Sequence, residues 1–295
     1  MQIRKMNIQE FVFNEKQYLN TGQVFTSKVE KDNWVFYHGT SSLMENNIDA
    51  QGLIWKKNGI GKEEVEQVLN IFHEMSWAGK HTGGYCILKP FTGDYDFGGG
   101  NEKSIYLAET SHRAMLYSTK DFAGGETQRA IRNCIEDLEK YLTDSSVRSE
   151  HENKQLENIN LYDSYYKSRP EEKMTKEEIE YMQENKPELV KVDLDWLESK
   201  LKSIQHIKET CNMSMSEYRY GLVYAVKLDK NNIEGITYDR AMGVQVKQVA
   251  NSSIIGKVVI PENFESKMLG HPWSDKIQWK RITKGSKLSE NLESK

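Results

Sequence analysis

The alternation of apolar and polar residues divides the chain into strand-like outer parts and a helical middle. Short runs rich in aromatic and β-branched residues, bounded by turn residues, are typical of β-strands. Two such runs precede the helical middle and three follow it. We expect strands at 33–42 ("NWVFYHGTSS"), 104–109 ("SIYLAE"), 220–229 ("YGLVYAVKLD"), 243–249 ("GVQVKQV") and 253–261 ("SIIGKVVIP").

Helices are expected between these strands. Directly after the first run, Ser42 and Glu45 fit a capping box, and Gly52 is placed to end the short helix that follows. After the second run, Thr110 or Ser111 is placed to cap a helix that begins "SHRAMLYS". A longer helix at 61–75 has one apolar face, made of Val65, Val68, Leu69 and Phe72.

The middle of the chain is charged and helical. It contains two apolar stripes at helical spacing, made of Ile131, Ile135, Leu138 and Leu142 and of Leu194, Leu197, Leu201 and Ile204. Strands on both sides of a helical block indicate one mixed α+β domain with an insertion. We expect the core halves at 1–123 and 217–283, the insertion at 124–216 and a flexible tail at 284–295.

Composition narrows the class of protein. The 295 residues carry a net charge of −4 with a pI near 6.1, so no general basic field favours nucleic acid. Neither a signal peptide nor a membrane span is expected, and the three scattered cysteines fit reduced thiols in the cytoplasm. No group of residues has the spacing of a metal site, so we expect no metal.

The first strand run ends in His38-Gly39-Thr40, which is an unusual place for a histidine followed by glycine. Without a Cβ, Gly39 lets a flat polar ligand approach the main chain, whose N–H and C=O can both bond to it. A carboxamide needs one donor and one acceptor side by side, and His38 and Thr40 could bind nearby hydroxyls. The pattern therefore fits a nicotinamide riboside, but taken alone it is more typical of a strand-to-turn junction with a packed histidine.

Two tyrosines make the ligand interpretation stronger. Tyr106 lies on the second strand run and Tyr117 on the helix after it, eleven positions later. A strand-turn-helix of that length can bring both rings to one pocket, where they could stack on a planar heterocycle. Ala114, one turn before Tyr117, leaves room between them. Core packing of either ring is the alternative.

Taken together, "YHGTS", "SIYLAETSHRAMLYS" and "GLVYAVKL" resemble the His-Tyr-Glu class of ADP-ribosyltransferases, which includes diphtheria toxin and the poly(ADP-ribose) polymerases. The similarity covers roughly 34–54, 95–118 and 219–261, whereas the insertion matches no known pattern. It implies a split β-sheet core that uses NAD+ as co-substrate. It further implies that His38 binds the nicotinamide-side ribose, Gly39 the carboxamide, and Thr40 either the adenosine side or the same ribose. Tyr106 and Tyr117 would then stack on the nicotinamide. The resemblance also places the glycines at 98–100 in a flap over the donor.

The third position of the motif departs from the family. Where the family has a glutamate that contacts the ribose, Gln245 aligns best here, with Gln248 as the alternative. Glutamine can hydrogen-bond to ribose, but it cannot act as a general base. The acceptor could carry its own base or be nucleophilic enough without one. Otherwise the base could be one of three other carboxylates, namely Glu109, Glu234 or Glu262. Alternatively, the protein binds NAD+ without turning it over.

The sequence therefore predicts a mono-ADP-ribosyltransferase, a glycosyltransferase of the toxin or effector kind, from a bacterium or phage. Its acceptor would be a macromolecule, with protein favoured over nucleic acid, and its partners a host target or an antitoxin. Arg113 or Arg240 would pair with the pyrophosphate. The alternatives are an RNA 2′-phosphotransferase and an NAD+- or ADP-ribose-binding pseudoenzyme whose insertion docks a partner.

Overall fold

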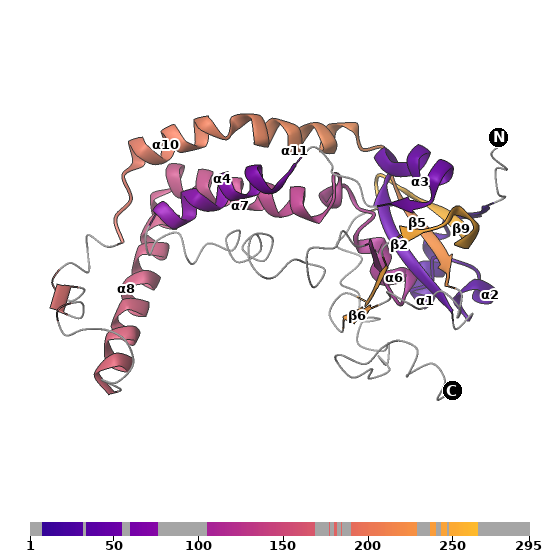
Figure 1. Ribbon diagram of the computed structural model, residues 1–295, viewed down its shortest axis with the longest axis horizontal. Helices are drawn as coiled ribbons and strands as arrows, with labels where there is room; N and C mark the ends of the chain where they lie inside the picture. The colour runs from indigo at the N-terminus through magenta and orange to yellow at the C-terminus, as the bar shows by residue number, and fades with distance from the viewer. Residues whose placement is uncertain are drawn as a thin grey trace. The chain divides into compact units, whose positions relative to one another are not determined.

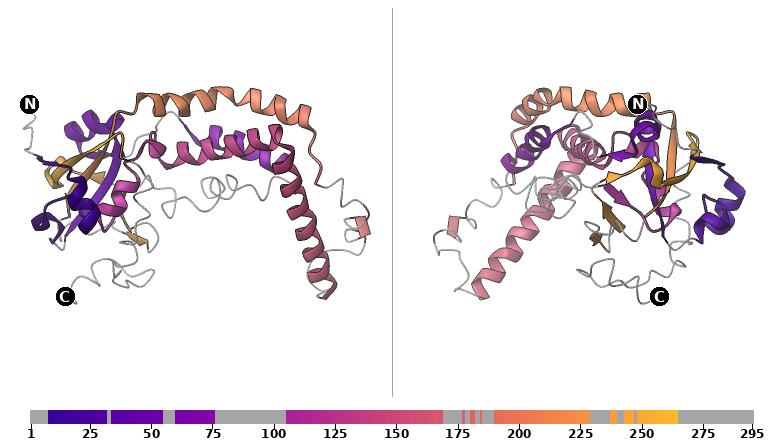
Figure 2. Two further views of the ribbon diagram at one scale, coloured as in Figure 1. Left: turned by 180° about the vertical axis from the view of Figure 1, so that it is seen from behind. Right: turned by 45° about the vertical axis from the view of Figure 1, so that its right-hand side comes forward.

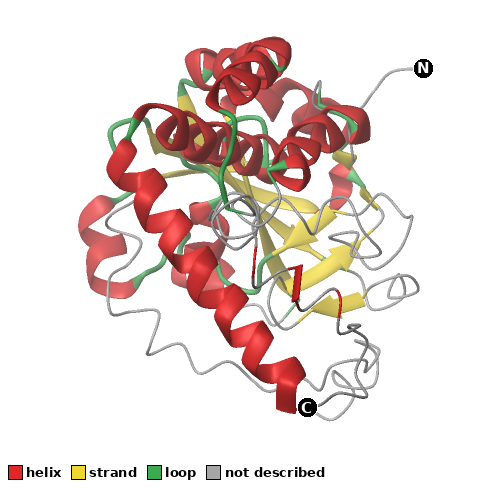
Figure 3. Cartoon of the chain, turned by 90° about the vertical axis from the view of Figure 1, so that its left-hand side faces the viewer, coloured by secondary structure: helices red, strands yellow, loops and turns green. Residues whose placement is uncertain are grey.

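The structure is a computed structural model in which two compact units are formed by different parts of the chain. It describes residues 8–31, 34–54, 60–75, 105–168, 177, 180–181, 184, 190–228, 237–239, 243–246 and 248–264. The first unit draws on Met1–Asn58, Gly98–Glu126 and Met213–Lys295, and the second on Gly59–Phe97 and Thr127–Asn212. All the described strands, drawn as yellow arrows in Figure 3, come from segments of the first unit. The mixed α+β class is therefore confirmed.

The largest sheet of the first unit has four strands in the order β1-β9-β5-β2. β1 (Gln9–Val12) pairs in parallel with β9 (Ile254–Pro261), and β9 pairs antiparallel with β5 (Tyr220–Lys227). β5 pairs antiparallel with β2 (Val35–Ser41), which is the strand expected from "VFYHGTS". Figure 1 shows β2, β5 and β9 side by side.

Two smaller sheets complete the strand set. β4 (Ile105–Leu107), β7 (Gly243–Val246) and β6 (Thr237–Asp239) form an antiparallel sheet in the order β4-β7-β6. β3 (Leu53–Ile54) pairs with β8 (Gln248–Val249). A single bridge, between Tyr37 and Ala108, joins β2 to the end of β4.

Apolar side chains pack on both faces of the large sheet. One core lies under α1 (Glu15–Thr21), α2 (Ser27–Glu30) and α6 (Ser111–Leu116). The other lies between the three sheets and α3 (Glu45–Gln51), and includes Phe36, Leu107, Tyr224 and Val244. The inner strand β5 therefore alternates between two buried faces, which explains its nearly continuous apolar sequence, whereas the edge strand β1 is mostly exposed.

Two predicted helix ends, at Gly52 after α3 and at Thr110 before α6, are confirmed. Gly52 ends α3 with a φ of 80°, as expected, and the Thr110 side chain caps α6 by accepting from the Arg113 N–H at 3.2 Å. The capping box of Ser42 and Glu45 was wrong. Ser42 opens a 3-10 turn (η1, Ser42–Met44), and its hydroxyl instead accepts from the distant Arg219 N–H at 3.0 Å.

The second unit is helical. It contains α4 (Lys62–Glu74), α7 (Glu126–Thr143), α8 (Ser145–Ser168), α10 (Leu194–Ser203) and most of α11 (Gln205–Glu217). α10 and α11 run alongside α4 and α7 in Figures 1 and 2, and the predicted stripes meet in one core that includes Phe72, Ile131, Leu138 and Leu197.

One helix lies elsewhere than its expected place. The expected boundaries assign α4 to the first half of the α+β core, but its buried face packs with α7 and α11, so it belongs to the helical unit. The reason is that Val65, Leu69 and Phe72 find their apolar partners on those helices. None of the helices in the described part of the chain is both long and apolar enough to cross a bilayer.

Candidate functional site at the end of β2

The candidate site lies where β2 stops pairing with β4, while its pairing with β5 continues. In an antiparallel pair, the N–H and C=O of successive residues point alternately to the two sides of the strand. The Leu228 N–H donates to the Trp34 carbonyl at 3.0 Å, so Trp34 and every second residue after it, including His38, face β5. Tyr37 and Gly39 therefore turn their main-chain groups to the other side, toward β4.

β2 and β4 are joined by main-chain hydrogen bonds only at Tyr37 and Ala108, and their pairing does not continue toward Gly39. The Tyr37 N–H donates to the Ala108 carbonyl at 2.8 Å, and the Ala108 N–H donates to the Tyr37 carbonyl at 2.7 Å. Two residues further on, the same register would join Gly39 to Tyr106. Instead, the Nδ1 atom of His38 lies 3.0 Å from the Tyr106 carbonyl oxygen. Among the described residues, no hydrogen bond then joins the Gly39 N–H or carbonyl to β4.

The bond to Tyr106 fixes the chemistry of the His38 ring. Because a carbonyl oxygen can only accept, Nδ1 of His38 carries the hydrogen, and Nε2 holds a lone pair when the ring is neutral. Burial lowers the pKa of His38 from its ordinary value of 6.5, and the bond to the Tyr106 carbonyl partly opposes this shift. At neutral pH the half-buried imidazole therefore offers Nε2 as an acceptor for a hydroxyl group.

Gly39 has a structural reason to be glycine as well. A Cβ built at this position would lie 1.7 Å from the carbonyl oxygen of Ala114 and 3.2 Å from the Cβ of Tyr117. The last turn of α6 thus rests directly on the main chain of β2. Ala114 is fully buried beneath this contact, so it contributes packing at the base of the site rather than an open wall.

Gly39 is also the common neighbour of the two tyrosines. Extending the register of the Tyr37–Ala108 bridge would place Tyr106 opposite Gly39, and the Cβ of Tyr117 lies 3.2 Å from the position of a Cβ built on Gly39. On β4, Ile105 and Leu107 point into the core between the sheets, so the half-buried Tyr106 points to the opposite side. The ring of Tyr117 packs edge-on against Phe122 with centroids 4.9 Å apart.

The register of β7 distinguishes the two candidates for the third position. Gln245 pairs directly with Tyr106 across β4 and β7, which places it in the same sheet as the tyrosine. Gln248 lies on β8, where it is exposed and pairs with Ile54 in the two-stranded sheet. The structure therefore associates Gln245, and not Gln248, with the other candidate residues.

The remaining candidates are spread around this point. Thr40 continues β2 and pairs with Leu222, and Glu109 follows the bridge residue Ala108. Glu262 forms an exposed ion pair with Lys120 at 3.2 Å. Arg113 lies half-buried in α6, whereas Glu234, Arg240 and the glycines at 98–100 are outside the described residues.

A buried charged cluster between the large sheet and α3 is a feature that the sequence analysis missed. The Nζ atom of Lys257, on β9, lies 2.9 Å from Glu45 and 2.7 Å from Asp49, both on α3. The hydroxyl of Tyr220 donates to Glu45 at 2.6 Å, and that of Tyr224 donates to Asp49 at 2.9 Å. A lysine inside the apolar run "SIIGKVVIP" was the available signal, because such a residue is rarely buried without partners.

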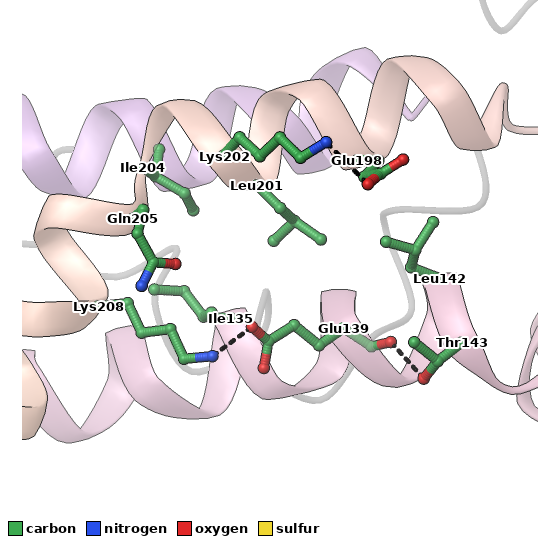
Figure 4. Close-up of a pocket in the computed structure, with 10 residues that line it drawn as sticks. All are labelled: Ile135, Glu139, Leu142, Thr143, Glu198, Leu201, Lys202, Ile204, Gln205 and Lys208. Atoms are coloured by element: carbon green, nitrogen blue, oxygen red, sulfur yellow. Dashed lines mark hydrogen bonds and ion pairs between the residues drawn. The ribbon is translucent and has the colours of Figure 1, made fainter.

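The helical unit holds a pocket of different character. Figure 4 shows this pocket, of about 480 Å³, between α7 and the α10–α11 pair. Its charged groups are paired with each other, Lys202 with Glu198 at 2.8 Å and Lys208 with Glu139. The Thr143 hydroxyl donates to the Glu139 carbonyl at 2.8 Å. The pocket therefore presents no nucleophile or base arranged for chemistry, and we assign it a packing role.

No cluster of three or more His, Cys, Asp or Glu side chains suited to a metal ion occurs in the part of the chain that the structure describes. Comparisons of the chain with protein-family models, with curated proteins and with solved structures found no match.

Proposed function

We propose that the protein is a mono-ADP-ribosyltransferase that takes ADP-ribose from NAD+ and transfers it to a macromolecular acceptor. The observation that supports this most directly is the separation of β2 from β4 after the Tyr37–Ala108 bridge. It leaves the Gly39 N–H and carbonyl facing the side where β4 would have continued. A donor and an acceptor on one residue are complementary to the carboxamide of nicotinamide.

The residues around Gly39 extend this complementarity. The Nε2 atom of His38 would accept a hydrogen bond from a hydroxyl of the adjoining ribose, because Nδ1 is committed to the Tyr106 carbonyl. Tyr106 and Tyr117, both neighbours of Gly39, would contact the two faces of the pyridinium ring. Aromatic faces next to a cation contribute about 0.5–2 kcal/mol each.

The transfer needs no covalent intermediate on the protein. The bond between the ribose C1″ and the nicotinamide nitrogen breaks, and its electron pair stays on the nitrogen and neutralises the pyridinium. A nucleophilic atom of the acceptor forms the new bond to C1″ and releases its proton. Holding the donor in one geometry while excluding water can lower such a barrier by about 7–11 kcal/mol. Arg113 would pair with the pyrophosphate.

The pairing of Gln245 with Tyr106 bears on the choice of acceptor. An amide at this position can hold a ribose hydroxyl but cannot remove a proton. We therefore propose transfer of a single ADP-ribose to an acceptor that is nucleophilic without help from this residue, with protein favoured over nucleic acid. The site of action would be the cytoplasm of the producing or target cell, and an antitoxin or host target would be the partner.

The experiment that tests this proposal is incubation of the purified protein with NAD+ labelled in the ADP-ribose part, together with a cell extract. We expect label to move onto macromolecules, and His38→Ala and Tyr106→Ala to abolish the movement while circular dichroism stays unchanged. Gln248→Ala should keep full activity and Gln245→Ala should lose it, since only Gln245 pairs with Tyr106. Full activity in both the His38 and the Tyr106 variant would show that the site is elsewhere.

Gln245 also favours a second candidate, an NAD+-binding protein without transferase activity. In that case calorimetry would detect saturable NAD+ binding that His38→Ala weakens, while no label moves and no nicotinamide is released. Gln245→Glu separates the two candidates further. In a transferase we expect this variant to raise NAD+ hydrolysis, because the new carboxylate can orient a water molecule.

A further inference from the structure

Two glycines let the end of α6 lie directly on the large sheet. Gly39 is on β2, and Gly221 is on β5, where it pairs with Ser41 of β2. Paired residues, and every second residue along a strand, face the same side of a sheet, so both missing side chains belong to one face. A Cβ built on Gly221 would lie 2.2 Å from the Ser118 carbonyl oxygen, and one built on Gly39 would lie 1.7 Å from that of Ala114. The main chain from Ala114 to Ser118 therefore rests on both strands.

Tyr117 lies inside this segment, and hydrogen bonds hold the main chain on both sides of it. Its own N–H donates to the Ala114 carbonyl at 3.0 Å, which is the same oxygen that lies against β2. On the other side, the Tyr218 hydroxyl donates to the Ser118 carbonyl at 3.0 Å, which is the oxygen that lies against β5. The main chain of Tyr117 is thus fixed against the sheet both before and after its Cα.

Tyr218 brings the second of these bonds from a distant part of the chain. It lies between α11 and β5 and is 2% exposed. Burial, together with the negative charges of Glu262 and Asp121, raises the pKa of Tyr218 to about 12. The hydroxyl therefore keeps its hydrogen at neutral pH, and it can donate to the Ser118 carbonyl at all times.

The direction of the Tyr117 ring depends on this main chain. With the main chain fixed, the ring can take only the few directions that its staggered χ1 rotamers allow. In the structure it packs edge-on against Phe122, with centroids 4.9 Å apart, and Phe122 ends the 3-10 turn η4 (Lys120–Phe122). Ser118 lies between the two rings in the sequence, so a shift of its peptide group would change their mutual position.

We propose that Tyr218 is a positioning residue for Tyr117 and that it acts through the Ser118 carbonyl. It keeps the Cβ of Tyr117 beside Gly39, where α6 rests on β2, and so sets the direction of the ring. The consequence for ADP-ribose transfer rests on the proposed function, but the positioning itself does not. It can therefore be measured in the protein alone, without NAD+.

Tyr18 provides a closely matched control for this test. Like Tyr218 it is 2% exposed, and its hydroxyl lies 2.7 Å from Nδ1 of His112, in the first turn of α6. Tyr18→Phe and Tyr218→Phe each remove one buried hydroxyl that is hydrogen-bonded to the α6 region. The two variants therefore share any general loss of stability, but only Tyr218 bonds to the residue that follows Tyr117.

The experiment uses the full chain labelled with ¹³C in its tyrosine rings. Tyr117→Phe identifies the Tyr117 signals, and Phe122→Leu measures how far the Phe122 ring displaces them. We expect the wild type and Tyr18→Phe to show the same displacement. Tyr218→Phe should lose most of it, and so should Gly221→Ala, whose Cβ would push the Ser118 carbonyl away from β5. Identical Tyr117 signals in Tyr218→Phe and Tyr18→Phe would overturn the proposal, even if the alanine variant does not fold.

Transfer kinetics provide a separate arm. If the wild type transfers label, Tyr218→Phe should lower kcat/KM for NAD+ by about 10-fold, because small misplacements of groups around a reacting centre have effects of this order. Tyr18→Phe should keep the wild-type value. An unchanged kcat/KM in Tyr218→Phe would contradict a positioning role at the site. If the wild type transfers nothing, the proposed function fails, and the Tyr117 signals still decide on Tyr218.

Discussion

At the scale of single residues, Gly39 combines two requirements in one position. Its absent side chain makes room for the Ala114 carbonyl, whereas its main-chain N–H and carbonyl face the other strand. These requirements concern different atoms, so they can be separated by experiment. Packing is tested by adding a Cβ, and the ligand role is tested by NAD+ binding in variants that keep the glycine.

Gly39→Ala should destabilise the first unit strongly. The added Cβ would stand 1.7 Å from a main-chain oxygen that cannot move without shifting α6, and we expect a loss of about 3 kcal/mol. Gly256→Ala is the matched control, because its Cβ would meet the ring of Phe11 at 2.7 Å, and a side chain can turn aside. That variant should lose about 1 kcal/mol. Urea unfolding measures both, and equal losses would contradict this explanation.

His38 should make stability depend on pH on the acid side. The unfolded chain takes up a proton near the ordinary pKa of 6.5, whereas burial keeps the folded His38 neutral to lower pH. Below about pH 6.5 the unfolded state therefore binds more protons, and the free energy of unfolding falls as the pH falls, until the folded pKa is reached. The slope from one group is at most about 1.4 kcal/mol per pH unit.

The measurement compares the wild type with His38→Asn in urea at several values between about pH 5 and pH 7.5. The variant should lose less stability per pH unit over the acid part of this range, while the two proteins run in parallel above it. Parallel curves throughout would mean that His38 has the same pKa in the folded and unfolded states.

At the scale of elements, α6 supports the site by resting on β2, and its first turn is held by a side-chain cap. Thr110 accepts from the Arg113 N–H, so Thr110→Ala should destabilise the first unit by about 1 kcal/mol. Thr26 precedes α2 in the same extended conformation, but its side chain makes no capping bond. Thr26→Ala should therefore change the unfolding midpoint very little, and a similar loss in both variants would argue against a specific role of the cap.

The elements also show how far the sequence could be interpreted. β2, the end of α3 at Gly52 and the apolar stripes of α7 and α10 were all predicted correctly, because periodicity and turn chemistry are local properties. The capping box at Ser42 failed because its hydroxyl bonds to Arg219, which is far away in the sequence. Sequence patterns do not reveal which distant group competes for a side chain.

The candidate site shows the same division between local and distant effects. The sequence singled out His38, Gly39, Tyr106 and Tyr117, and the structure makes Gly39 the neighbour of the other three. The sequence did not reveal that the Ala114 carbonyl packs against Gly39. Nor did it reveal the contacts of Lys257 on the far side of the sheet, because both depend on how separate segments fold together.

At the scale of the whole molecule, the chain forms two units whose apolar cores share no residue among those the structure describes. Each core can therefore be weakened separately. Leu138 is fully buried in the helical unit, and Leu161 on α8 is 67% exposed. This pair of leucines gives a direct test of the division.

Leu138→Ala should cost about 2–5 kcal/mol in the helical unit, because it leaves a cavity among packed helices. Hydrogen exchange should become faster in α7, α10 and α11 and remain unchanged in β5 and β9. Leu161→Ala should alter neither set of amides measurably. Equal acceleration in the strands would mean that the two units unfold as one cooperative body.

The contact between Gly39 and Ala114 means that a glycine retained at position 39 among related sequences would be explained by packing alone. In a library randomised at position 39 and screened only for protease resistance, glycine would be recovered, because larger residues displace the helix. Persistence of that glycine in descendants would then say nothing about catalysis. Substitution at position 38, whose imidazole is only half-buried, would bear more directly on the proposed transfer of ADP-ribose.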